Sequence, residues 1–222
     1  LWRVNFDVYS ANEEHWRRIG GNTALIALHF PVIGNSFLFI AIISLLIFDI
    51  LDLSKIEVGK LELFVEEFNI GDLITDVENT ITPLIQTNNN RLEIATESNL
   101  PSITNDLTKI RQSLFNLLSN AAKFTENGLI LVSVGLDKDG SVVEFTVKDQ
   151  GIGLSTEQIG RIFEPFAQAE SSTSKNFGGT GLGLSISREF CRMMGGDLVA
   201  ESVPGKGSTF KMTVLLDGAM LA

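Results

Sequence analysis

The stretch DQGIGL, residues 149–154, places one carboxylate beside two glycines. A turn of this kind usually closes a strand at the protein surface, because glycine adopts backbone angles that other residues avoid. The same turn could also form a floor for a flat polar ligand. Asp149 would then accept a hydrogen bond, while Gly151 and Gly153 would let the backbone approach where a side chain would collide. Taken alone, the stretch leaves both interpretations open.

A second group of polar residues lies on a predicted helix. In DLTKIRQSLFNLLSNAAKFT, residues 106–125, apolar residues recur three and four apart, which predicts a helix with one buried face. Asn116 and Asn120 are four residues apart and share a face, and Lys123 follows one turn later. On their own, these side chains are typical of a solvated helix face.

Two glycine-rich stretches complete the set of candidates. GGTGLGL, residues 178–184, departs from the dinucleotide-binding pattern G-x-G-x-x-G because the spacing after Gly181 is wrong. PGKGST, residues 204–209, departs from the phosphate-binding P-loop because a glycine separates Lys206 from Ser208. Neither stretch identifies a nucleotide site by itself.

The composition limits the classes of function. The chain has 222 residues and a formal net charge of −10 at pH 7. An acidic chain is a poor partner for nucleic acid, whose phosphates need a basic face, although a few amides and one lysine could hold a small anion. The single cysteine, Cys191, excludes an intrachain disulfide and favours a reducing compartment. Its helical context predicts a small core residue.

Other patterns predict the elements that position these residues. A helix is predicted at 72–86, capped by Asn69 or Asp72 and disturbed by Pro83, and Ser155 with Gln158 predicts a capping box. An earlier helix ends near Gly59, and another covers 182–194. Strands are predicted at 60–68, 91–97, 129–136, 141–149, 197–203 and 208–216, with a turn at 98–102.

The order of the motifs carries a family resemblance. An Asn-x-x-x-Asn-x-x-Lys helix, an Asp-x-Gly-x-Gly turn, an F-x-P-F stretch, a Gly-Thr-Gly-Leu-Gly loop and a Gly-Lys-Gly-Ser-Thr-Phe turn follow one another. Over about residues 104–215 this order resembles the ATP-binding domain of sensor histidine kinases, in the ATPase superfamily of Hsp90, type II topoisomerases and MutL. The stretches LDLSKIEVGKLEL and FEPFAQAESSTSKNFGGTGLGLSIS resemble the hybrid type most closely.

The resemblance implies a role for each candidate residue, with ATP and Mg²⁺ as ligands. Asp149 would accept a hydrogen bond from the exocyclic amine of adenine, which guanine does not present there. Asn120 would offer Mg²⁺ a neutral oxygen. Lys123 would neutralise phosphate charge, and Asn116 would support the same helix face. The other implied ATP-binding residues are Gly151, Gly153, Phe166, Thr180, Gly181, Leu182, Gly183 and Thr209.

Some of these residues belong to a predicted loop and its boundaries. Residues 180–183 lead into a helix N-terminus, where free amides and the helix dipole suit an anion. Residues 167–181 would form a mobile lid over the nucleotide, with Phe163 and Phe166 as its hinge and packing surface. Thr209 either faces the pocket or serves only to form its strand.

The resemblance also implies an α+β fold. We expect a two-layer α/β sandwich, in which helices cover one face of a mixed sheet, preceded by a helical segment. The expected divisions are an N-terminal segment at 1–35, a helix at 36–60 resembling the second helix of the dimerisation hairpin, the catalytic domain at 61–217 and a tail at 218–222.

The N-terminal part departs from the family pattern. The chain has no segment like the phosphoacceptor His-Glu-Leu-Arg-Thr-Pro, and neither His15 nor His29 has that context, so the phosphorylated histidine is not identified. Residues 24–48 contain no Asp, Glu, Lys or Arg, and the run is long enough for a bilayer. A membrane helix, a buried dimer helix and an altered or out-of-frame N-terminal segment all remain open for this run.

The expected function is an ATP-dependent protein histidine kinase of a two-component system. One alternative is a nucleotide-binding regulatory module that cannot autophosphorylate, and another is an ATPase of the superfamily that drives conformational change. The expected partners are a second copy of the chain, through the helical segment, and a response regulator or receiver domain. The resemblance implies a cytoplasmic catalytic domain, tethered to the inner membrane if residues 24–48 span it.

Overall fold

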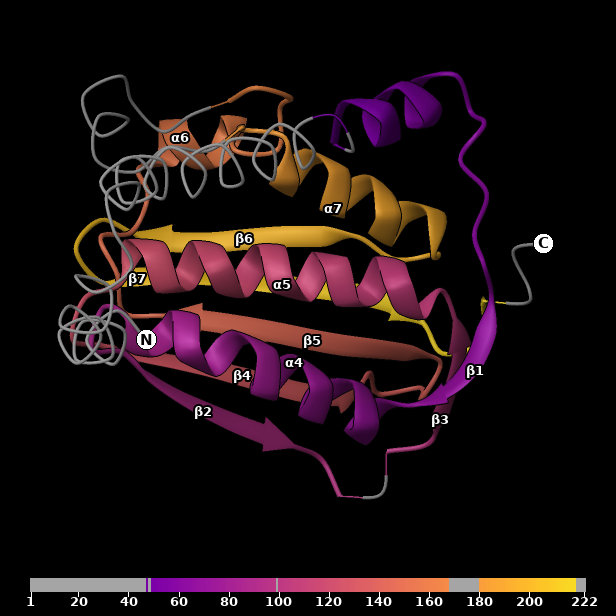
Figure 1. Ribbon diagram of the computed structural model, residues 1–222, viewed down its shortest axis with the longest axis horizontal. Coiled ribbons are helices and arrows are strands. Elements are labelled where there is room, and N and C mark those ends of the chain that lie inside the picture. The colour runs from indigo at the N-terminus through magenta and orange to yellow at the C-terminus, as the bar shows by residue number, and fades with distance from the viewer. Residues whose placement is uncertain (1–46, 48, 99, 168–179, 219–222) are drawn as a thin grey trace, which may run out of the picture. The chain divides into compact units, whose positions relative to one another are not determined.

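The computed structural model describes residue 47 and residues 49–98, 100–167 and 180–218 (Figure 1). The chain divides into two compact units, Leu1–Phe48 and Asp49–Ala222. The apolar run at 24–48 lies almost wholly outside the described residues. The sheet and the helices that cover it all belong to the second unit.

The centre of this unit is a mixed sheet of five strands in the order β2-β4-β5-β7-β6. Strands β2 and β4 are parallel, and the other neighbours are antiparallel. The mixed sheet confirms the predicted fold class. The strands are β2 (Arg91–Thr96), β4 (Leu129–Leu136), β5 (Val142–Asp149), β6 (Leu198–Val203) and β7 (Gly207–Leu215).

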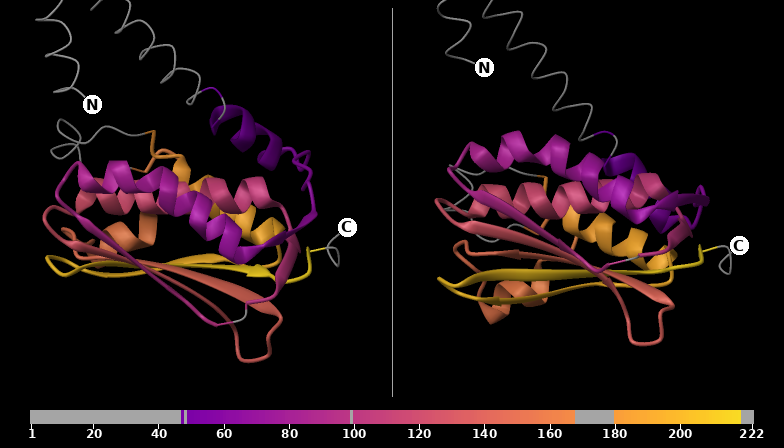
Figure 2. Two further views of the ribbon diagram at one scale, coloured as in Figure 1. Left: turned by 60° about the horizontal axis from the view of Figure 1, so that its bottom comes forward. Right: turned by 90° about the horizontal axis from the view of Figure 1, so that it is seen from below.

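Three helices cover one face of the sheet (Figure 2). They are α4 (Ile70–Gln86), α5 (Leu107–Phe124) and α7 (Gly183–Met193). The apolar stripe predicted for α5 is buried, and it packs against the inward-facing residues of the central strands. The short helix α6 (Thr156–Arg161) contacts β6 instead. The two-layer arrangement is therefore confirmed.

The predicted helix boundaries are confirmed by their caps. Asn69 is the residue that caps α4, Asp106 caps α5, and Ser155 with Gln158 forms the capping box of α6. The helix at 49–57 stops before Gly59, which adopts a left-handed φ of 65°.

The strand predicted at 60–68 was wrong in extent, and one short strand was not predicted. Only Glu66–Asn69 of the predicted strand at 60–68 is β-structure, and this strand, β1, pairs with β3 (Ser102–Asn105). Strand β3 begins at the last residue of a predicted turn, and its short length gave little alternation to detect. Helix α4 runs to Gln86, as predicted, with Pro83 inside it, so the carbonyl of the exposed Asn79 lacks the N–H that a residue other than proline would donate.

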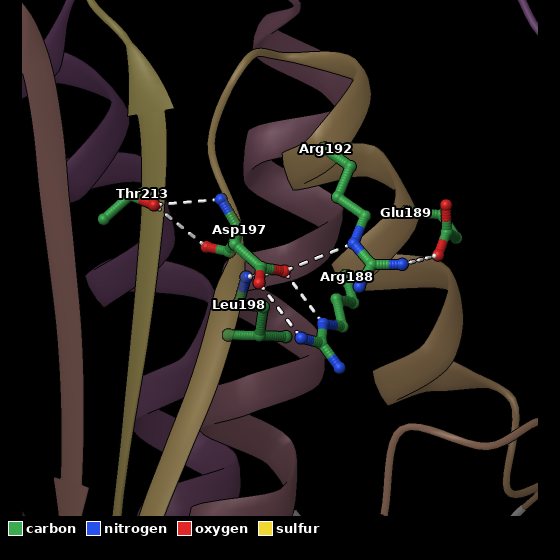
Figure 3. A network of polar contacts seen from close by, with 6 residues as sticks. All are labelled: Arg188, Glu189, Arg192, Asp197, Leu198 and Thr213. Atoms are coloured by element: carbon green, nitrogen blue, oxygen red, sulfur yellow. Dashed lines mark hydrogen bonds and ion pairs between the residues drawn. The ribbon is translucent and has the colours of Figure 1, made fainter.

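A polar network fixes the end of α7 against the sheet (Figure 3). Arg188 donates two hydrogen bonds to the Asp197 carboxylate, at 2.8 Å from Nε and 3.0 Å from Nη2. The backbone N–H of Asp197 donates to Oγ1 of Thr213 on β7 at 2.9 Å. Arg192 adds an ion pair to Glu189 at 2.7 Å. The network therefore joins α7 to β7 through the residue that precedes β6.

The Asn69 cap gives a test of the helix boundary. Asn69 Oδ1 accepts from the backbone N–H groups of Gly71 at 2.7 Å and Asp72 at 3.3 Å. We expect Asn69→Ala to lower the free energy of unfolding by about 1 kcal/mol, and Asn69→Asp to keep most of the stability because it retains the acceptor. Urea denaturation measures both. Equal losses in the two variants would contradict the capping role.

Candidate functional site

Asp149 ends strand β5 with its side chain turned toward the helices. Val143, Phe145 and Val147 are buried at alternate positions, and Asp149 is the next in that series, with 5% of its surface exposed. Its Oδ1 atom accepts hydrogen bonds from the backbone N–H groups of Gly151 at 2.8 Å and Ser208 at 3.2 Å. Its Oδ2 atom has no hydrogen-bond partner among the described residues.

The burial of Asp149 determines what this carboxylate can do. Burial raises the pKa of the Asp149 carboxyl above its ordinary value of 3.8, although the hydrogen bonds from Gly151 and Ser208 oppose the rise. The charged form is therefore less stable in this place than in water. A ligand N–H group that reached Oδ2 would replace hydration lost on folding, so the site favours a donor ligand.

The turn after Asp149 is held tightly against neighbouring backbone. A side chain at Gly151 would collide with the carbonyl of Phe124, the last residue of α5, and one at Gly153 would collide with the carbonyl of Val203. Gly153 also has a left-handed φ of 67°. Contact with the protein's own backbone is therefore one reason for both glycines. The backbone N–H of Ile152 donates to the Phe124 carbonyl at 3.2 Å, which brings the turn to the end of α5.

Asn116 and Asn120 share one face of α5, as predicted. Nδ2 of Asn120 donates to Oδ1 of Asn116 at 3.4 Å. Asn116 in turn donates to Oγ of Ser187 on α7 at 3.0 Å, and a side chain at Gly183 would collide with the Asn116 amide. Asn116 therefore fixes α5 against the start of α7, whereas Oδ1 of Asn120 has no hydrogen-bond partner among the described residues.

Lys123 supplies a cation at the same end of α5. The residue is half-buried, and its Nζ atom lies 4.8 Å from the centroid of the Phe124 ring. Burial lowers the pKa of Lys123 from its ordinary value of 10.5. A partly desolvated ammonium attracts an anion more strongly than an exposed one does.

The start of α7 forms the third part of the site. Leu182 is the N-cap residue, and its side chain makes no capping hydrogen bond at this end of α7. Thr180 Oγ1 accepts from the Leu182 N–H at 3.1 Å and donates to Asp49 Oδ2 at 3.3 Å. Gly181 has a left-handed φ of 71°. Among the described residues, the first-turn amides of α7 therefore have no side-chain acceptor and, together with the helix dipole, suit an anionic group.

Phe166 lies where the described chain approaches the predicted lid. It has a left-handed φ of 63° and is 64% exposed, which is unusual for a bulky residue. Phe163 is half-buried, with the Arg188 guanidinium carbon 4.8 Å from its ring centroid. Residues 168–179 are outside the described residues, so the predicted lid is not tested.

Thr209 is not brought to this site. It pairs with Lys148 on β5, and alternation along β7 places it on the sheet face opposite the helices. Ser208 instead lies on the Asp149 face, is buried, and donates its N–H to that carboxylate. The structure favours the strand-forming interpretation for Thr209. Counting alternate positions back from the buried residue Phe210 would have identified Ser208.

Other predicted features lie outside the described chain or are absent from it. His15 and His29 are both outside the described residues. No helix in the described part of the chain combines the length and apolar character needed to cross a bilayer. The described residues also contain no cluster of three or more His, Cys, Asp or Glu side chains that could hold a metal ion.

Three segments therefore converge: the turn at 149–153, the second half of α5 and the start of α7. They provide a buried acceptor at Asp149, an amide oxygen at Asn120, an ammonium at Lys123 and uncapped helix amides. These groups fit a ligand that carries an N–H donor at one end and anionic groups, with a hard cation, at the other. This combination of acceptor, amide oxygen, ammonium and helix amides agrees with a magnesium-bound nucleotide.

Comparison with known proteins gives a family match to this region. Residues 105–218 match the family described as histidine kinase-, DNA gyrase B-, and HSP90-like ATPase. The matched segment begins at the last residue of β3 and includes all three converging segments. Every described site residue discussed above, apart from Asp49, lies inside it.

Similar full-length proteins are much longer than this chain. It is 43% identical over 173 residues to hybrid signal transduction histidine kinase B of Dictyostelium discoideum, covering 76% of this chain and 9% of that protein. It is 38% identical over 175 residues to sensor protein GacS of Pseudomonas syringae pv. syringae, covering 77% and 19%. The chain therefore spans a fifth or less of the length of these relatives.

Solved structures confirm the fold. Full-length ShkA in complex with AMPPNP matches with a TM-score of 0.67 and 32% identity, over 75% of this chain and 34% of that one. The nucleotide-free catalytic domain of histidine kinase ThkA matches with a TM-score of 0.60 and 28% identity, over 70% of this chain and 98% of that one.

Asp149→Asn tests whether the carboxylate is kept at a cost to stability. The raised pKa means that the charged form destabilises the fold above that pKa, and that the penalty disappears as the pH falls toward 3.8. Asparagine keeps an oxygen for Gly151 and Ser208. At pH 7 we expect the variant to melt at the same temperature as the parent or a few degrees higher.

The pH dependence provides the control. Any gain in melting temperature should shrink as the pH is lowered through the folded pKa of Asp149. The matched variant is Asp137→Asn, since Asp137 Oδ1 also accepts two backbone N–H groups, from Ser141 and Val142, but in an exposed hairpin. A substantial loss of stability in Asp149→Asn at pH 7 would contradict the assignment of a destabilising carboxylate.

Proposed function

Because the chain belongs to the family of histidine kinase-, DNA gyrase B- and HSP90-like ATPases, we propose that it is the catalytic part of an ATP-dependent protein histidine kinase. It would bind Mg-ATP and pass the γ-phosphoryl group to a histidine in two-component signalling. The observation that carries the proposal is the buried Asp149 carboxylate, whose Oδ1 is fixed by two backbone N–H groups and whose Oδ2 has no partner among the described residues.

Asp149 would recognise the base. Its Oδ2 atom would accept a hydrogen bond from the exocyclic amine of adenine, whereas guanine carries a carbonyl oxygen at that position. Two acceptors facing each other in a buried place would leave both unpaired, which disfavours guanine. The fixed geometry at Oδ1 supports this role, because little ordering of the carboxylate would be needed on binding.

The phosphates would lie toward α5 and α7. The uncapped first turn of α7 and the ammonium of Lys123 would hold their negative charge. Asn120 would offer Oδ1 to Mg²⁺, an ion that takes few protein ligands and keeps water and phosphate oxygens. When bound, Mg-ATP supplies the phosphoryl group and a divalent charge that neutralises it. The residues of the chain contribute position and charge.

The acceptor histidine and the partners follow from the similarity to hybrid sensor kinases. The acceptor would be His15, His29 or a histidine outside this sequence. A receiver domain or response regulator would take the phosphoryl group from that histidine. A second copy of the chain would associate through the helical segment before residue 60, and the catalytic domain would face the cytoplasm.

Labelling with γ-labelled ATP and Mg²⁺ tests the proposed function. The chain is incubated alone and then with a histidine-bearing hairpin from a similar kinase. Acid-labile label on the chain, or on the added hairpin only, is expected for a competent kinase domain, and the first result would identify His15 or His29 as the acceptor. Asp149→Asn is the matched control, and it should reduce labelling and ATP affinity about tenfold or more.

Two outcomes would contradict the proposal. Bound ATP without label on either protein would indicate a nucleotide-binding regulatory module. Absence of ATP binding by the folded parent chain would remove the nucleotide assignment itself.

Asn120→Ala separates binding of magnesium phosphate from binding of the base. We expect the affinity for Mg-ATP to fall about tenfold to 100-fold, because a ligand to the ion is lost, while the affinity for adenosine changes less than about twofold. Calorimetric titration measures both ligands. Asn79→Ala on the exposed side of α4 serves as the matched control. Equal losses for both ligands would show that Asn120 is only structural.

A further inference from the structure

Ser202 on strand β6 makes three hydrogen bonds with one hydroxyl group. Its Oγ atom accepts from the backbone N–H of Leu154 at 2.8 Å, donates to the carbonyl of Gly207 at 2.8 Å and lies 2.9 Å from Oγ of Ser208. A hydroxyl has one proton and two lone pairs. Because a carbonyl can only accept, the Ser202 proton is used at Gly207. The proton between the two hydroxyls must therefore come from Ser208.

The direction of this bond decides what Ser208 presents to Asp149. Ser208 is 8% exposed, lies on the same sheet face as Asp149 and already donates its backbone N–H to Oδ1 of that carboxylate. With its hydroxyl proton directed to Ser202, Ser208 has only lone pairs left for other neighbours. It cannot donate to Oδ2 of Asp149. The Ser208 hydroxyl and Oδ2 of Asp149 therefore leave only acceptor positions for a ligand.

We propose that Ser202 is a specificity-determining positioning residue, which holds the Ser208 hydroxyl in the orientation that selects a purine with an amino group at C6. This inference rests on the proposed function, because it concerns the base that Asp149 binds. A 6-amino group brings two N–H donors to a site of acceptors. A 6-oxo group brings another acceptor, which would be buried without a hydrogen bond.

Loss of the Ser202 hydroxyl would free Ser208 to rotate. Its proton could then be donated to Oδ2 of Asp149, where it would compete with the amine of the base, or to the oxygen of a 6-oxo purine. Both changes would reduce the difference in affinity between a 6-amino purine and a 6-oxo purine. Ser202 also fastens the backbone at Leu154 and Gly207, but loosening of that backbone would weaken both ligands alike. The ratio of the affinities for the two kinds of base therefore distinguishes a role of Ser202 in specificity from a role in holding the backbone.

The test compares ATP with inosine triphosphate, which has a 6-oxo group in place of the 6-amino group. Dissociation constants for both, with Mg²⁺, are measured by calorimetry on the parent chain and on Ser202→Ala. We expect the parent to prefer ATP, and the ratio of the two constants to fall about fivefold to tenfold in the variant, the effect of one hydrogen bond. Ser202→Thr retains the hydroxyl and should restore the ratio.

Ser208→Ala provides a second, independent variant. It leaves the bonds of Ser202 to Leu154 and Gly207 in place. Ser208→Ala can therefore test the inference even if the Ser202→Ala protein does not fold. We expect Ser208→Ala to lower the ratio as well. In the double variant Ser202→Ala/Ser208→Ala, the ratio should fall no further than in Ser208→Ala, because both changes remove the hydrogen bond between the two hydroxyls.

The outcomes distinguish this inference from the proposed function. If Ser202→Ala weakens ATP and inosine triphosphate equally, or Ser208→Ala leaves the ratio unchanged, Ser202 has only a structural role while the kinase assignment stands. If the folded parent chain binds neither nucleotide, the proposed function fails and the inference fails with it.

Discussion

A carboxylate buried at the end of a central strand is the constraint on which the rest of the site depends. Asp149 loses most of its hydration on folding, and two backbone N–H groups at Oδ1 recover only part of it, which leaves the pKa of the carboxyl raised. The two donors come from different places, namely the turn that follows β5 and the start of β7. The turn after β5 and the start of β7 must therefore both be held at fixed distances from the end of β5. This requirement explains much of the surrounding structure.

The contacts around the two turns meet that requirement. The turn at 149–153 is bonded to the end of α5 through Phe124, and the next residue, Leu154, is bonded to β6 through Ser202. The glycines of the turn lie against backbone on both sides. Helix α5 is in turn fixed to α7 through Asn116, and α7 to β7 through the Arg188–Asp197 pair. A displacement in any of these elements would alter the position of the Asp149 acceptor, so the proposed selectivity depends on contacts throughout the scaffold.

The sequence predicts those parts of the site that follow from local periodicity and capping. The shared face of Asn116 and Asn120 follows from helical spacing, and the caps of α4 and α6 follow from residue type. Contacts between distant strands have no such local signal. The choice between Ser208 and Thr209 depends on which face of β7 is buried, and the bond between Ser202 and Ser208 depends on the pairing of β6 with β7. Strand β3 was missed because a short strand shows too little alternation.

The net charge of −10 does not conflict with an anionic ligand, since charges act over different distances. At physiological salt the screening length is about 8 Å, so exposed acidic residues farther away contribute little to the potential at the site. Helix amides and a half-buried lysine act at contact distance, where screening is weak. The acceptors proposed to select the base belong to another part of the site, at the end of β5 and on β7. Nearby groups thus determine which end of a ligand each part binds, while the overall charge governs only the exclusion of extended polyanions.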